Sequence, residues 1–222
     1  MIRYAGVLLV LALAATGASA DDADTVRTIY REWMVPRSAE FVSQSAKLVG
    51  ATEQFCTASA QDSESSLRTL RDAWTASLVA WERASTVAIG PGLEHRLRAQ
   101  LDFTPTRPRM IAEAVARTPS GVSGMDLIGA PAKGFPALEW LLWTKPMRPA
   151  SDECRYAVQL ALEIERQARL MAEAFARAAA TSLDAKAAKA ALSEFINQWI
   201  AGLDRLRWTS MVQPVQRART SD

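Results

Sequence analysis

The sequence is poor in the residues on which most enzymes depend. It contains one histidine, His95, and two cysteines among 222 residues. No His-Glu-x-x-His, Cys-x-x-Cys, Walker loop or Gly-x-Ser-x-Gly motif occurs. A catalytic zinc usually takes three protein ligands, largely histidine, so zinc hydrolysis is disfavoured. His95 lies in a Glu-His-Arg context, which is more typical of a solvated helix residue than of a ligand.

Strand patterns and a strong net charge are also missing. No stretch shows sustained alternation of apolar and polar residues, and no Asn-Gly hairpin turn occurs. The 26 basic and 24 acidic residues nearly cancel. The sequence therefore lacks the basic surface of a nucleic-acid-binding protein, and we expect no nucleic-acid partner.

Residues 1–20 have the features of a secretory signal. Arg3 supplies a positive start, an apolar run follows over residues 7–15, and Ala18-Ser19-Ala20 is an A-x-A cleavage site. The apolar run is too short to span a bilayer. We expect cleavage after Ala20 and a mature chain of residues 21–222 in a bacterial periplasm, with no transmembrane segment.

The two cysteines, Cys56 and Cys154, both lie in the expected mature chain. In an oxidising compartment an even number of cysteines favours a disulfide, so we predict that this pair is bonded. Two free buried thiols are the alternative.

Helical periodicity dominates the mature chain. We expect a short helix over residues 24–35 that ends at Pro36, followed by a helix with an apolar stripe over residues 41–59. The next helix begins near Leu67, carries Trp74 and Trp81 as core residues, and ends before residue 90.

The middle of the chain is less regular, and two long helices follow it. Short helices over 93–101 and 110–117 and a long loop over 119–133 are expected there. The last two helices carry apolar stripes that begin at Tyr156 and Leu192. The prediction is one all-α domain over residues 21–222, a helical bundle with an interrupted middle segment.

The most distinctive stretch runs from Gly134 to Trp143. Pro136 favours a helix start, and every side chain after Gly134 is apolar or aromatic except Glu139. A helix that is apolar all round is normally buried, so we expect Glu139 in the interior. A buried carboxylate needs hydrogen bonds, a cation or a proton. The alternative is a carboxylate in a first helical turn, stabilised by free N–H groups and an arginine.

Carboxylates could provide a hard-metal site. Glu139, Asp102 and Asp126 would supply oxygen ligands for iron(III), calcium or magnesium. We select Gly134, Glu139, Asp102 and Trp143 as candidate binding residues and Glu139 as the candidate metal ligand, for iron or another divalent metal. No catalytic residue is assigned.

The order of these motifs resembles the imelysin family, also called insulin-cleaving membrane protease-like proteins. The family signature is Gly-x-His-x-x-Glu, in which histidine and glutamate lie one helical turn apart. Gly134 and Glu139 match its outer positions, but Pro136 stands at the histidine position and has no ligand atom. The resemblance rests on Ala73-Trp74, Trp81, Gly90-Pro91, Phe103 to Pro105, Gly134 to Leu142, Cys154 to Ala157 and the helix that ends at Leu203 to Pro214.

The resemblance implies an exported all-α protein associated with iron acquisition. The first interpretation is a non-catalytic periplasmic component that binds iron, haem or an iron-handling partner. A metallopeptidase that uses Glu139 as base or ligand is the second interpretation. The third is a structural module that meets another envelope protein. Family members commonly have two helical lobes, whereas this sequence suggests about one and a half, so the groove between lobes would be reduced or supplied by a partner.

Overall fold

The computed structural model describes residues 22–87, 89–144 and 147–220. These residues form helices and connecting segments without a strand, which confirms the predicted all-α class. None of the helices in this part of the chain combines the length and apolar character that a membrane crossing requires. The predicted signal at residues 1–20 and its cleavage site at Ala20 lie outside the described residues.

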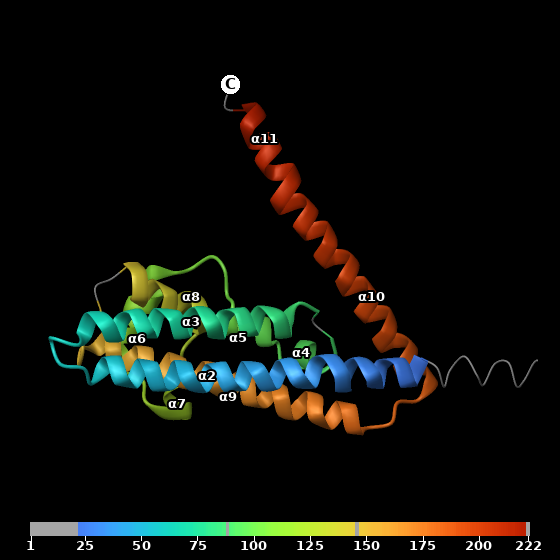
Figure 1. Ribbon diagram of the computed structural model, residues 1–222, viewed down its shortest axis with the longest axis horizontal. Coiled ribbons are helices and arrows are strands. Elements are labelled where there is room, and N and C mark those ends of the chain that lie inside the picture. The colour runs from blue at the N-terminus through green and yellow to red at the C-terminus, as the bar shows by residue number, and fades with distance from the viewer. Residues whose placement is uncertain (1–21, 88, 145–146, 221–222) are drawn as a thin grey trace, which may run out of the picture.

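Three long helices make the body of the bundle (Figure 1). They are α2 (Val35–Cys56), α3 (Ser63–Ser85) and α9 (Asp152–Ala180), and α2 packs against both others. The predicted core positions on α3 are confirmed, because Trp74 and Trp81 are 8% and 1% exposed. The Trp81 ring lies 5.6 Å from that of Phe41 on α2. Its Nε1 is buried without a hydrogen-bond partner among the described residues.

The first helix does not end at Pro36, as the sequence predicted. Helical residues 22–28 continue through a π-helical segment, η1 (Ile29–Met34), directly into α2. Proline has no N–H and its ring clashes with the carbonyl four residues earlier, so the wider π turn before Pro36 lets the helix continue. Two further π segments, η3 (Trp140–Thr144) and η4 (Trp208–Val212), also end two residues before a proline.

The interrupted middle segment consists of short helices, most of which pack against α9. The predicted loop over 119–133 contains two of them, so that prediction is wrong in part. Met125 on α7 and Ile128, just after the end of α7, are both buried, so this stretch packs on the bundle instead of lying free as a loop. The short helices are α4 (Pro91–Glu94), α5 (Leu97–Leu101), α6 (Pro108–Arg117), α7 (Gly121–Asp126), η2 (Ala130–Ala132) and α8 (Gly134–Glu139).

The predicted disulfide is present between Cys56 and Cys154. It joins the last residue of α2 to the first turn of α9, with 5.6 Å between the two Cα atoms and a sequence separation of 98. The bond therefore fixes two long helices to each other at one end of the bundle.

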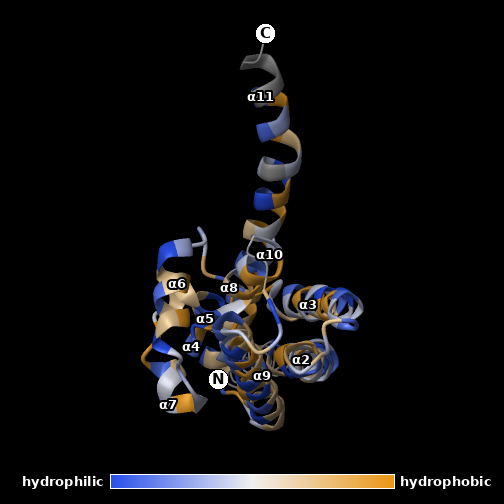
Figure 2. Ribbon diagram, turned by 90° about the vertical axis from the view of Figure 1, so that its left-hand side faces the viewer, coloured by the Kyte–Doolittle hydropathy of each residue, from blue (hydrophilic) through white to orange (hydrophobic). Residues whose placement is uncertain are grey.

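The last helical run leaves the bundle (Figures 1 and 2). It comprises α10 (Ala185–Arg207), η4 and α11 (Gln213–Thr220). Leu192 and Phe195, near its base, are half-buried against the core. Beyond them, Leu203 and Leu206 are 59% and 62% exposed. The helix was predicted correctly, but most of its apolar stripe does not lie in the bundle core.

Candidate functional site

The motif stretch begins where two backbone segments meet. Gly134 has a φ of +71°, and a Cβ on this residue would overlap the Leu101 backbone at the end of α5. Only glycine satisfies both conditions without strain. Just before it, the Tyr156 hydroxyl on α9 donates a 2.5 Å hydrogen bond to the carbonyl of Ala132. Gly134 is therefore a packing residue, and whether it also contacts a ligand stays a prediction.

The inner face of α8 and η3 is fixed to α3. Phe135 is 1% exposed, and its ring lies 6.2 Å from that of Trp74. The Trp74 Nε1–H donates to the Phe135 carbonyl at 3.4 Å. One turn earlier on α3, Arg71 donates from Nε and Nη2 to the carbonyl of Leu142, at 3.1 and 2.5 Å. These contacts determine which side of the stretch faces solvent.

Glu139 lies on the outer side and is exposed, so the predicted burial is wrong. The stretch packs on α3 and α9 with one of its sides only, so one apolar face is enough to make that contact, and Glu139 on the opposite side can face solvent. The remaining apolar positions are tryptophans, Trp140 and Trp143, which tolerate half-exposure because part of each ring system can meet water. No other described residue bonds to the Glu139 carboxylate. Whether it binds a metal stays a prediction.

Trp143 shares the outer face with Glu139, four residues away. Its side chain is 48% exposed, and its ring lies 4.9 Å from that of Trp74 in an edge-to-face arrangement. The Arg71 guanidinium carbon is 5.3 Å from the Trp143 ring centroid. The site thus presents one carboxylate beside a supported aromatic surface.

The other predicted carboxylates lie elsewhere. Asp102, at the end of α5, accepts a 3.4 Å contact from Arg98, and desolvation raises the pKa of its carboxyl against the opposing effect of this arginine. Asp126 lies 3.3 Å from Arg166 on α9. Throughout the described residues, no group of three or more His, Cys, Asp or Glu side chains could hold a metal ion. The predicted oxygens are therefore not brought together as one ligand set.

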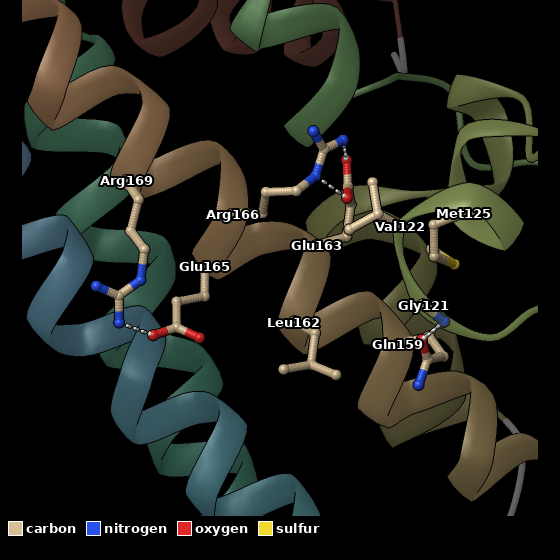
Figure 3. A pocket seen from close by; sticks show the side chains of 9 residues that line it. All are labelled: Gly121, Val122, Met125, Gln159, Leu162, Glu163, Glu165, Arg166 and Arg169. Atoms are coloured by element: carbon tan, nitrogen blue, oxygen red, sulfur yellow. Dashed lines mark hydrogen bonds and ion pairs between the residues drawn. The ribbon is translucent and has the colours of Figure 1, made fainter.

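A pocket that the sequence did not indicate lies between α7 and α9, away from the outer face of α8 and η3 (Figure 3). Its volume is about 300 Å³, and Val122, Met125 and Leu162 contribute its apolar wall. Glu163, only 3% exposed, accepts two 2.7 Å hydrogen bonds from Arg166, and this pairing raises the pKa of the guanidinium.

The charged side chains around the pocket between α7 and α9 are paired with each other. Gln167 also donates to Glu163 at 2.9 Å, and Arg169 donates to Glu165 at 2.6 Å. The spacing Glu163-x-x-Arg166-Gln167 was a helical i, i+3 and i+4 pattern that could have revealed the buried acid. Because the charged groups of this cluster are already paired, it acts as a structural tie within α9 and, through Arg166 and Asp126, between α9 and α7.

The comparisons with known proteins agree on one family. The family model for imelysin, designated Peptidase M75, matches residues 34–222. An imelysin-like protein from Psychrobacter arcticum has a similar structure, with a TM-score of 0.72 and 17% identity over 85% of this chain and 61% of that chain. An iron-regulated protein A precursor from Parabacteroides distasonis has a TM-score of 0.67 and 19% identity over 89% of this chain and 62% of that chain.

These likenesses have a defined extent. This chain spans about three fifths of the length of each structural neighbour. No curated protein sequence matches it significantly. The family match nevertheless covers most of the sequence, and the two neighbours share the helical fold. The chain therefore belongs to the imelysin family.

Proposed function

We propose that this chain is an exported, non-catalytic component of iron acquisition that binds iron, as the metal or as haem, at the outer face of α8 and η3. The observation that carries the proposal is the exposed carboxylate of Glu139 beside the half-exposed ring of Trp143. A carboxylate is a suitable ligand for hard iron(III), and an aromatic surface suits a flat macrocycle. The iron-regulated name of one structural neighbour supports the same context.

A binding role fits this site better than hydrolysis. A hydrolytic metal centre needs several fixed ligands and a base near the activated water. In the motif, Pro136 is buried at the position where the family signature has histidine, whereas Glu139 faces solvent. His95 is exposed at the end of α4, in a different part of the chain. Glu139 would accordingly contribute one ligand to iron that is held jointly with other groups.

Calorimetric titration with ferric citrate and with haem tests the proposal. Binding of at least one of the two is expected, and Glu139→Gln should weaken it by about tenfold or more, since a neutral amide is a poor ligand for iron(III). Glu53→Gln is the matched control, because Glu53 is another exposed helical glutamate on α2. No binding of either ligand, or equal weakening in both variants, would contradict the proposed site.

Export is tested separately from binding. The protein recovered from the periplasmic fraction should begin at Asp21, since cleavage is expected after Ala20. An N-terminal sequence that retains residues 1–20, or recovery only from the cytoplasm, would contradict this part of the proposal.

A metallopeptidase remains the second candidate, favoured by the peptidase designation of the family model. It requires cleavage of an unfolded protein that a chelator stops and that Glu139→Gln abolishes. We expect no such cleavage, because Pro136 provides no ligand atom.

A further inference from the structure

A guanidinium group lies beside the outer face of α8 and η3, next to Trp143. It belongs to Arg71 on α3, which is half-buried, and its central carbon is 5.3 Å from the centroid of the Trp143 ring. Its Nε and Nη2 donate to the Leu142 carbonyl oxygen at 3.1 and 2.5 Å. These two hydrogen bonds hold the positive charge at a fixed place beside the ring.

The contact with Leu142 uses only one edge of this planar group. A guanidinium has five N–H donors, and the N–H of Nε and one N–H of Nη2 form the edge that faces the carbonyl. The two N–H groups of Nη1 and the second one of Nη2 have no acceptor among the described residues. The edge between the two Nη atoms can bind a carboxylate through two parallel hydrogen bonds.

Arg71 also lacks the carboxylate partner that a comparable guanidinium of this chain has. Arg166, which is likewise half-buried, contacts the carboxylates of Glu163 and Asp126. Within residues 22–87, 89–144 and 147–220, Arg71 forms no ion pair. A partly desolvated charge without a counterion is costly, so an anionic group that binds to Arg71 gains both Coulomb attraction and charge-assisted hydrogen bonds.

The ligand of this face must bring most of the groups that hold its iron. The outer face offers one carboxylate, that of Glu139, and across the described part of the chain no cluster of three or more His, Cys, Asp or Glu side chains could hold a metal ion. Iron(III) takes several oxygen or nitrogen ligands. A preformed complex meets this need, and haem and ferric citrate both carry carboxylates that Arg71 can bind.

We propose that Arg71 is a specificity-determining residue of the outer face of α8 and η3, where its free Nη edge binds a carboxylate of an iron-bearing complex. The inference rests on the proposed function, because it concerns the ligand of the same site. The half-exposed ring of Trp143, which the same guanidinium contacts, provides an apolar surface beside the bound carboxylate.

Pairs of ligands that differ in the free carboxylate test this role. Haem is compared with haem dimethyl ester, in which both propionates are esterified, by absorbance titration in a mild detergent. Ferric citrate is compared with ferric acetohydroxamate, which has no carboxylate, by calorimetry. In at least one pair the carboxylate-bearing member should bind about tenfold or more tightly than its analogue. The pair that shows this preference identifies the source of the carboxylate.

Arg71→Gln separates recognition of the carboxylate from support of the site. The variant should lose the preference, so that both members of the pair bind with similar affinity. Loss of the Leu142 contact alone would weaken both members equally and would leave the preference intact. Arg83→Gln is the matched control, because Arg83 lies on the same helix, is exposed and pairs with Glu40 at 3.3 Å. The preference should be unchanged in this control.

Equal affinities within both pairs for the wild type would overturn the role of Arg71. A preference that survives Arg71→Gln, or one that Arg83→Gln also removes, would overturn it as well. If Glu139→Gln still weakens binding in any of these cases, the proposed site stands without this inference. Failure of all four ligands to bind would overturn the proposed function and this inference with it.

Discussion

At the residue scale, the contact between Gly134 and Leu101 gives the motif glycine a structural role. A Cβ at position 134 would meet backbone atoms, which cannot move aside as a flexible side chain can. Gly134→Ala should lower the free energy of unfolding by more than about 2 kcal/mol, through left-handed strain and this overlap. Gly50→Ala is the control and should raise it by about 0.5–1 kcal/mol, since Gly50 is a helical residue with open space around it. Urea denaturation measures both, and equal effects would contradict the argument.

Position 136 provides a second residue-scale prediction. Pro136→His restores the family signature in sequence, but the side chain at 136 points into the buried face while Glu139 is exposed. The two should therefore not ligate one metal. We expect melting curves with and without added metal to coincide for this variant, at a temperature below that of the wild type. A metal-dependent rise in melting temperature would show that the two side chains can converge.

Trp81 combines large buried area with an unpaired N–H. Trp81→Ala should cost about 3–5 kcal/mol of unfolding free energy, the usual range for emptying an aromatic core site. Trp81→Phe should cost much less, because it keeps a ring and removes the unsatisfied donor. Denaturant midpoints distinguish these outcomes. A loss below about 1 kcal/mol for Trp81→Ala would contradict the core assignment.

Two carboxyl groups should make stability depend on pH. Desolvation and the nearby Asp102 raise the pKa of Glu82 above 4.5, while Arg98 and Arg205 oppose the shift. The pKa of Asp102 is likewise raised above 3.8. A raised pKa means that the folded state binds the proton more tightly than the unfolded chain does. These groups therefore destabilise the fold above their folded pKa values and stop doing so as pH falls towards their ordinary values.

Glu82→Gln tests this pH dependence. The variant should be more stable than the wild type at neutral pH, and the difference should shrink as the pH is lowered towards 4.5. Thermal melting over this pH range measures it. A wild type that gains on the variant with rising pH would reverse the sign and contradict desolvation as the main cause of the raised pKa.

At the element scale, sequence periodicity identified the long helices because their apolar stripes are local patterns. It placed Trp74 and Trp81 correctly for the same reason. It failed at Pro36, where a π turn lets the helix continue, because proline signals a break only in regular α-geometry. Periodicity also showed that α10 has an apolar stripe, but it could not show whether other helices of the same chain pack against that stripe.

The disulfide belongs to the same scale, since it connects α2 to α9. Opening a cross-link between residues 98 positions apart should cost about 4–5 kcal/mol, by a chain-entropy estimate that depends on the model used. Cys56→Ser with Cys154→Ser should lower the denaturant midpoint accordingly. The native mass should be lower than the reduced mass by two hydrogens, and two alkylatable thiols in the oxidised protein would contradict the bond.

At the scale of the whole molecule, the family and the fold were predictable, whereas the setting of the candidate site was not. The motif from Gly134 to Trp143 was recognised from its residues, and the family model covers it. The exposure of Glu139 depends on α8 lying over α3 and α9, a contact between segments far apart in sequence. No local pattern in an almost wholly apolar stretch distinguishes its inner face from its outer face.

The packing of α2 against α9 also sets an order of events during synthesis. Phe41, Leu48 and Phe55 on α2 are fully or almost fully buried, yet α9 begins only at Asp152. A growing chain can pair α2 with α3 early, but it must hold the remaining apolar side of α2 uncovered until some hundred further residues have been made. A chain truncated before α9 should therefore expose this apolar side of α2 and aggregate more readily than the full chain.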